Sequence, residues 1–175
     1  MRCALTTGKG ACAIWWRPTR RSPPRCRARC VTRLSTASVA TALYTRGPRS
    51  QFVQGVKPIE RQPVTMVGQA FTLRYIPARE DRNQLEVFRN PDHPQRVAVE
   101  TCPEGQILVM DARGDASAAT AGSILVTRLA VRGCAGVVSD GGFRDAKGIG
   151  ELDMPAYCAN PSAPIAGAQQ GILTV

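Results

Sequence analysis

Two short apolar runs, each ending in an acidic residue, constrain the fold of this 175-residue chain most strongly. Residues 106–111 read Gln-Ile-Leu-Val-Met-Asp, and residues 135–140 read Ala-Gly-Val-Val-Ser-Asp. Continuous apolar runs of this length are typical of strands buried on both faces of a parallel sheet. Residues 119–131 lie between them with apolar residues at helical spacing, and Arg132-Gly133 ends that pattern. The chain therefore predicts a βαβ unit with polar groups collected at the strand ends.

Weaker patterns flank this unit. Ser35 predicts the N-cap of a short helix over residues 35–44, because its hydroxyl can accept a hydrogen bond from a first-turn amide. Residues 64–76 alternate and are rich in β-formers, which predicts one strand or two with Gly68 as a bulge or turn. A further short strand is expected over residues 155–158. Two stretches are expected to be loops, residues 77–96 and residues 159–170.

The formal charge of +10 is distributed very unevenly. The first 57 residues hold 12 Lys or Arg and no acid, whereas the other 11 basic residues accompany all 13 acidic ones. The body of the protein is thus near neutral, and we do not expect direct nucleic-acid binding from it. With 43% hydrophobic residues and no apolar run near the ~20 residues of a bilayer span, the composition is that of a globular protein that does not cross a membrane.

Residues 1–33 combine arginines and prolines with four cysteines, Cys3, Cys12, Cys26 and Cys30. Three functional readings are a nucleic-acid-binding arm, an organellar presequence and a zinc site. The spacing of Cys26 and Cys30 allows a zinc half-site, but Cys3 and Cys12 are nine residues apart and the segment has no histidine. We expect residues 1–33 to be a disordered basic extension and residues 34–175 to form the folded domain. The other cysteines are scattered and no signal peptide is evident, so we expect reduced thiols and a cytoplasmic location.

The segment Asp140-Gly-Gly-Phe-Arg144-Asp145 could carry chemistry. Arg144 can bind a substrate carboxylate with two parallel hydrogen bonds, and Asp145 can offer a hard oxygen ligand to Mg²⁺ or Mn²⁺, directly or through water. The structural alternative is an Arg–Asp pair that only fixes a loop. Ser123 follows Gly122 near the start of the predicted helix, where free amides suit an anion, and a plain helix entry is the alternative there.

Other polar side chains have simpler explanations. The single histidine, His93, lies in the polar loop and is expected to be solvated, so a serine hydrolase triad is excluded. Lys147 is expected to be a surface lysine, and no lysine lies in an apolar run that would favour a Schiff base. Three further carboxylates could act as a base but are more often turn formers: Asp111, Asp115 and Asp140.

Several separated segments agree in order with one known family. Gly122-Ser-Ile-Leu125, Arg144-Asp145, residues 34–44 and residues 68–81 together resemble the RraA-like family, which includes regulators of ribonuclease activity and divalent-metal 4-hydroxy-4-methyl-2-oxoglutarate aldolases. The resemblance covers residue 34 to the C-terminus. It implies an α/β class of fold, the α/β/β swivelling-domain type, and a homotrimer with sites between subunits.

The resemblance also implies roles for individual residues. In the aldolase members a Gly-Asp-x-Leu turn binds substrate, and here the turn falls on Gly122, Ser123, Ile124 and Leu125. Arg144 matches the arginine that binds the substrate's carboxylate side, and Asp145 matches the acid that holds Mg²⁺ through water. The chain departs from the pattern at Ser123, which cannot carry a negative charge or act as a base at neutral pH.

These residues favour a divalent-metal-dependent lyase, with Mg²⁺ or Mn²⁺, that cleaves or decarboxylates a small 2-keto acid such as 4-hydroxy-4-methyl-2-oxoglutarate or oxaloacetate. Arg144 and Asp145 would be its catalytic residues. The alternative is a non-catalytic regulator that binds and inhibits a ribonuclease. Asp145 favours the lyase, because the regulator branch of the family tends to lack this acid, whereas Ser123 favours the regulator.

The sequence stops at Val175 just as an apolar segment begins, so we expect the RraA-like domain to be C-terminally incomplete. A sheet that lacks strands leaves open edges and apolar surface. We therefore predict that residues 34–175 alone aggregate or assemble weakly, as measured by size-exclusion chromatography with light scattering. A sharp, monodisperse trimer would contradict this expectation.

Overall fold

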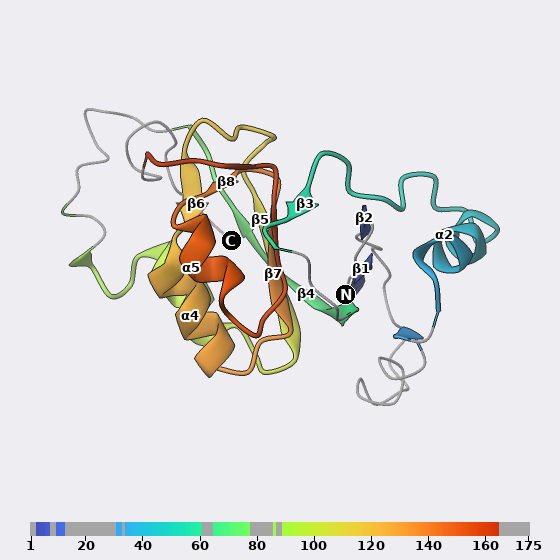
Figure 1. Cartoon of the computed structure of the whole chain (residues 1–175), viewed down its shortest axis with the longest axis horizontal. Helices are drawn as coiled ribbons and strands as arrows, with labels where there is room; N and C mark the ends of the chain where they lie inside the picture. Colours follow the sequence, from blue (N-terminus) through green and yellow to red (C-terminus); the bar gives the residue numbers. More distant parts are fainter. Residues whose placement is uncertain are drawn as a thin grey trace.

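The computed structural model describes residues 3–7, 10–12, 31–32, 34–60, 65–77, 86 and 89–164. Over these residues it is a mixed α/β structure with a central seven-stranded sheet, a small three-stranded sheet and the helices α2 to α5 (Figure 1). The strand order of the central sheet is β2-β1-β4-β5-β7-β9-β3, and that of the small sheet is β10-β8-β6. In the part of the chain that is described, no helix is long and apolar enough to cross a membrane.

Four parallel strands form the middle of the central sheet: β4 (Met66–Arg74), β5 (Gln106–Asp111), β7 (Gly136–Ser139) and β9 (Ala156–Cys158). Three strands join its edges through antiparallel pairings. β3 (Lys57–Pro58) pairs with β9, and β1 (Cys3–Thr7) pairs with β4 and with β2 (Gly10–Cys12). The expected βαβ unit is thus present, with β5 and β7 as direct neighbours.

The small sheet continues the chain beyond the carboxyl ends of the central strands. β6 (Ala119–Ala121), β8 (Gly142–Phe143) and β10 (Asn160–Pro161) follow β5, β7 and β9 in turn and pair in parallel. The residues that follow neighbouring strands of the central sheet are therefore brought together by the pairings of the small sheet.

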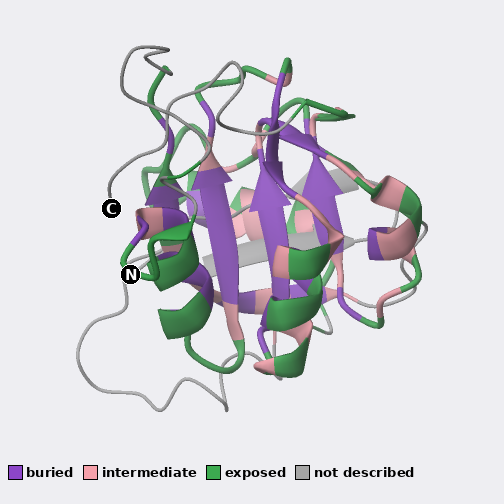
Figure 2. Cartoon of the chain, turned by 90° about the vertical axis from the view of Figure 1, so that its left-hand side faces the viewer, coloured by how far each residue is buried: buried purple, intermediate pink, exposed green. Residues whose placement is uncertain are grey.

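Three helices cover one face of the central sheet: α3 (Pro94–Thr101), α4 (Ser123–Val131) and α5 (Ala146–Gly150). Figure 2 shows the buried strands behind helices whose outer surfaces are exposed. The short α2 (Thr36–Tyr44) lies at the opposite end of the molecule, beyond β1 and β2 (Figure 1). Ser35 caps it as expected, since its hydroxyl accepts a hydrogen bond from the Ser38 amide at 3.1 Å.

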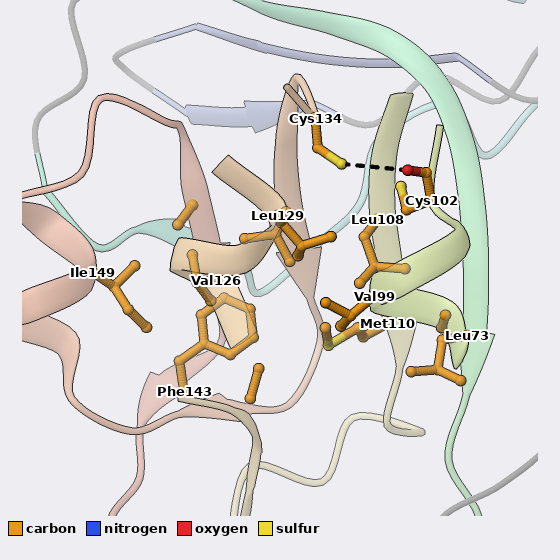
Figure 3. Packing of buried hydrophobic residues seen from close by; sticks show 14 of the residues in the cluster. Leu73, Val99, Cys102, Leu108, Met110, Val126, Leu129, Cys134, Phe143 and Ile149 are labelled. Carbon is orange, nitrogen blue, oxygen red and sulfur yellow. Dashed lines mark hydrogen bonds between the residues drawn. The ribbon is translucent and has the colours of Figure 1, made fainter. Parts of the chain in front are cut away.

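Alternation along β5 divides the core between the two faces of the sheet. Leu108 and Met110 point to the helices and join Val126, Leu129 and other side chains of the larger cluster (Figure 3). Ile107 and Val109 point to the other face, where a second cluster is covered by the segment that contains Val53 and Val56. Both faces of β5 are therefore buried, as the continuous apolar run predicted.

Several expected elements need correction. Ala119–Ala121 forms β6 rather than the first turn of a helix, because its backbone pairs with β8, so α4 begins only at Ser123. The loop expected over residues 77–96 stops before Pro94, where α3 starts. The fixed φ of proline suits this first helical position. Gly68 is no bulge within β4, and its missing side chain instead admits the Gly105 carbonyl, which would lie 2.8 Å from a Cβ.

His93 is buried rather than solvated: it is the N-cap residue of α3, and only 7% of its surface is exposed. Burial lowers the pKa of its imidazole. Cys102, Cys134 and Cys158 are buried free thiols, and the Cys134 thiol donates to the Cys102 carbonyl (Figure 3).

The N-terminal stretch also differs from expectation, since β1 and β2 lie within the 33 residues for which disorder was predicted. Most of residues 1–33 lie outside the described part of the chain. The domain boundary at residue 34 stays a prediction, as do the C-terminal incompleteness and the apolar segment after residue 170.

Two valines of α4 provide a matched test of the core. Val126 is fully buried against the sheet, whereas Val131 is 73% exposed. We predict that Val126→Ala lowers the free energy of unfolding by about 1.5–3 kcal/mol, because two buried methyl groups and their contacts are lost. Val131→Ala should change it by less than about 0.5 kcal/mol. Denaturant unfolding measures both, and equal effects would contradict the packing described here.

Candidate functional site

The carboxylate of Asp145 joins two segments that are distant in sequence. Asp145 follows β8, and its Oδ2 accepts hydrogen bonds from the amide of Ser123 at 3.3 Å and from the Ser123 hydroxyl at 3.2 Å. Gly122 is the N-cap residue of α4 and has no side chain to cap it. Asp145 thus satisfies the first amide of α4 from outside the helix and places a negative charge at its positive end.

The backbone of Asp145 is left-handed, with φ at 58°. Asp and Asn tolerate this conformation better than other side chains, although it is uncommon for any residue but glycine. The turn aims the carboxylate back toward α4 while the chain enters α5. Such a conformation at a polar cluster marks a position worth testing for function.

Arg144 lies beside the same carboxylate, with Nε 3.6 Å from Oδ2 of Asp145. The amide of Arg144 donates to the carbonyl of Ala121 at 3.0 Å, which ties β8 to the residue just before the α4 entry. The side chains of both Arg144 and Asp145 are partly exposed. A guanidinium in this position can meet an anion from solvent while it stays near its own carboxylate.

Gly122 makes this close packing possible. A Cβ at residue 122 would lie 2.8 Å from Nε and 2.9 Å from Cγ of Arg144, and 2.9 Å from Oδ2 of Asp145. These distances are shorter than real Cβ contacts, so any side chain there would displace Arg144 and Asp145. The space that glycine leaves at residue 122 is therefore taken up by the side chains of Arg144 and Asp145.

An open hollow of about 500 Å³ adjoins the pair. One wall consists of Phe143, Arg144, Asp145 and Ala146, and the other consists of Pro161, Ser162 and Ala163. The second wall was not anticipated from the sequence, which gave residues 159–170 only as a loop. Nothing in its small side chains marks them as site residues, because their place follows from the pairing of β10 with β8.

The structure brings together most of the predicted residues, but not all of their side chains. Gly122, Ser123, Arg144 and Asp145 are in mutual contact. The side chain of Ile124 is 76% exposed, whereas that of Leu125 packs against the core. Their amides belong to the first turn of α4, where no helical carbonyl is available to them. Lys147 is exposed on α5, as expected for a surface lysine.

The three other candidate carboxylates act in turns. Asp140 accepts from the amides of Ala112 and Gly114 and so holds the loop after β5. Asp111 pairs with Arg74 at 2.8 Å and caps the amide of Arg113, while Asp115 caps that of Ser117. These contacts match the structural alternative stated for each residue.

The donor set at the site suits a hydrated hard cation held by one carboxylate. Within the described residues, Oδ1 of Asp145 accepts no hydrogen bond, so one oxygen remains for a metal-bound water while the other holds α4. No group of three or more His, Cys, Asp or Glu side chains that could hold a metal occurs in the described ranges. Mg²⁺ often keeps several waters and uses one or two carboxylates plus oxygens of its substrate, so the residues present fit this ion.

The chain is thus a mixed α/β protein in which an Arg–Asp pair lies beside a helix N-terminus, at the carboxyl ends of parallel strands. The model of the RraA-like family, described as Aldolase/RraA, matches residues 36–172, which is well over half of the chain. The chain belongs to the RraA-like family, and the resemblance found in its sequence is confirmed.

Solved structures show the same fold. Streptomyces coelicolor RraAS2, titled an unusual member of the RNase ES inhibitor RraA protein family, is 28% identical with a TM-score of 0.71 over 82% of this chain and 67% of that chain. The RNA-processing inhibitor RraA from Thermus thermophilis is 22% identical with a TM-score of 0.53, over 72% of this chain and 69% of its own. The expected α/β fold of the RraA type is thus confirmed.

A curated relative carries an enzyme name. The protein "Putative 4-hydroxy-4-methyl-2-oxoglutarate aldolase" of Halalkalibacterium halodurans is 37% identical over 54 residues, which are 31% of this chain and 26% of that protein. The match therefore spans about a quarter of the relative's length.

Two glycines near Asp145 provide opposite tests of the packing. Gly122→Ala should lower the free energy of unfolding by about 1–3 kcal/mol, because the new methyl group displaces Arg144 and Asp145 from α4. Gly148→Ala in α5 would place a Cβ at an ordinary 3.6 Å from that of Ser123. It should be neutral or stabilising by up to about 1 kcal/mol, since alanine restricts the unfolded chain. Denaturant unfolding would contradict the geometry if both variants behaved alike.

Proposed function

We propose that this chain is a divalent-metal-dependent carbon–carbon lyase that acts on a small 2-keto acid. The observation that supports it is that Arg144 and Asp145 line one open hollow, while the Asp145 carboxylate also accepts the Ser123 amide at the first turn of α4. Family membership and the aldolase name of one partial relative agree with this class of reaction. The expected homotrimer, with sites between subunits, is part of the proposal.

Each residue has a role that follows from its position. Arg144 binds the substrate carboxylate and orients it toward Asp145. The first-turn amides of Ile124 and Leu125 face the same anionic group with the positive end of the α4 dipole. Asp145 would hold Mg²⁺ or Mn²⁺ with the carboxylate oxygen that α4 does not use, and the bound ion would supply Lewis acidity for the 2-keto acid. The Ser123 hydroxyl keeps the carboxylate in place by donating to Oδ2.

Of the two reactions considered, decarboxylation needs less from the protein. Aldol cleavage of 4-hydroxy-4-methyl-2-oxoglutarate requires a base that removes the proton of the C4 hydroxyl. Ser123 cannot be that base, and Asp111, Asp115 and Asp140 are engaged in turns. In oxaloacetate the C3–C4 bond breaks without such a base, because its electrons move toward the keto oxygen as CO₂ leaves, and water then protonates C3 to give pyruvate. We therefore propose oxaloacetate as the better substrate.

Pyruvate release tests the proposal. The full chain is assayed with oxaloacetate and with 4-hydroxy-4-methyl-2-oxoglutarate, with Mg²⁺ and with EDTA, against protein-free blanks that contain the same metal. We expect metal-dependent release from oxaloacetate, and a loss of at least about 100-fold in Asp145→Asn, which keeps the left-handed turn but not the charge. Asp153→Asn removes an exposed acid and should leave the rate unchanged.

The opposite outcome supports the second candidate. Equal rates in wild type and Asp145→Asn, or no activity in a folded oligomer, would overturn the lyase proposal. A non-catalytic regulator that binds a ribonuclease would then be preferred, because Ser123 replaces the acid of the aldolase pattern and a structural relative is titled a member of a ribonuclease-inhibitor family.

A further inference from the structure

A buried threonine lies between the two halves of the site. Thr120 is the middle residue of β6 and is fully buried. Two residues later the chain reaches Gly122 and the entry of α4. The pairing of β6 with β8 is irregular at this point, with a register shift between Ala119 and Ala121. Thr120 therefore relies on contacts outside the regular ladder to fix its position.

Its carbonyl is held by two side chains from other elements. The Tyr75 hydroxyl donates to the Thr120 carbonyl at 2.7 Å, and Nε2 of Gln95, in the first turn of α3, donates to the same oxygen at 2.7 Å. Gln95 Nε2 also donates to the Tyr75 hydroxyl at 3.1 Å. Burial raises the pKa of Tyr75, so its phenol stays a donor at physiological pH. A buried carbonyl with two donors is strongly held, because every lost donor leaves a desolvated group without a partner.

The hydroxyl of Thr120 points the other way, to the turn between β7 and β8. Thr120 Oγ1 donates to the carbonyl of Gly142 at 3.0 Å and lies 2.9 Å from the hydroxyl of Ser139. Because each hydroxyl has one proton, Ser139 must donate to Thr120, and Ser139 in turn accepts from the Gly141 amide at 3.0 Å. Two residues beyond Gly142 the chain reaches Arg144.

Thr120 thus connects both halves of the site, one through the chain and the other through a hydrogen bond. One path leads from Thr120 to the amides of Ser123 to Leu125, and the other leads through Gly142 to Arg144 and Asp145. Neighbouring atoms leave little room for adjustment, since a Cβ at Gly141 would lie 2.9 Å from Cγ2 of Thr120. A shift at Thr120 would be transmitted to the distance between Arg144 and the first turn of α4.

We propose that Thr120, held by Tyr75, Gln95 and Ser139, is a positioning residue that sets the separation between the α4 N-terminus and the Arg144–Asp145 pair. As regards catalysis this rests on the lyase function proposed above. Thr120 does not touch the substrate in this account. It acts by keeping two parts of the site in register, and displacements of about 1 Å in such arrangements cost roughly 100-fold in rate.

Thr120→Val and Thr120→Ser form the central comparison. Valine keeps the shape but removes the hydroxyl, whereas serine keeps the hydroxyl and loses only a methyl group. We expect kcat for oxaloacetate to fall by about 10- to 100-fold in Thr120→Val, with KM changed by less than about threefold, and to recover in Thr120→Ser. Ile107→Val weakens the cluster on the other face of the sheet and should keep the wild-type kcat. Tyr75→Phe removes one of two donors and serves if Thr120→Val does not fold.

Amide hydrogen exchange of the full chain without substrate gives a readout that does not need activity. Faster exchange confined to residues 121–125 and 142–146 in Thr120→Val, absent in Ile107→Val, would support the positioning role even if the wild type released no pyruvate and the lyase proposal failed. Wild-type kcat and exchange in both Thr120→Val and Tyr75→Phe would overturn it. So would exchange raised uniformly over the sheet, because that pattern reports general destabilisation.

Discussion

The parallel pairing of β5 with β7 is the constraint on which the site depends. Because both strands are buried on both faces, their register is fixed by packing on each side of the sheet, and their carboxyl ends finish at the same edge. The two segments that follow β5 and β7 then pair with each other as β6 and β8. The Ser123 and Asp145 segments, 22 residues apart in sequence, are therefore placed within hydrogen-bond distance of each other.

In the proposed function, Asp145 combines a structural and a chemical role in one carboxylate. Its Oδ2 completes the first turn of α4, which Gly122 cannot cap, and the absence of a side chain at Gly122 is what lets the carboxylate and Arg144 approach the helix. The same contact would be expected if Arg144 and Asp145 only fixed a loop. The proposed function depends on the Oδ1 atom of Asp145, which α4 does not use, on the adjoining hollow and on the exposure of Arg144. A pair that only fixed a loop would need none of these. Ser123 donates to this carboxylate, whereas an acid at residue 123 would repel it.

Elements with strong local signals, and the residues that follow them, could be predicted from the sequence. The apolar runs of β5 and β7, the Ser35 cap and the Arg144–Asp145 pair could be predicted because each signal lies within a few residues. The strand β6 could not be separated from α4, since its identity comes from pairing with β8, more than 20 residues away. For the same reason, no local sequence signal indicated three other features: the burial of His93, the wall formed by Pro161–Ala163 and the contacts of Thr120. Long-range pairing and burial decide these features.

Binding of Mn²⁺ measured by electron paramagnetic resonance, with pyruvate present as the product anion, tests the central claim most directly. If Oδ1 of Asp145 holds the ion through water beside a bound 2-keto acid, wild type should bind Mn²⁺ at least about 10-fold more tightly than Asp145→Asn, and pyruvate should strengthen binding only in wild type. Equal Mn²⁺ affinity in the two proteins, each folded and with α4 intact, would contradict the account. Asp145 would then be a cap of α4 and nothing more.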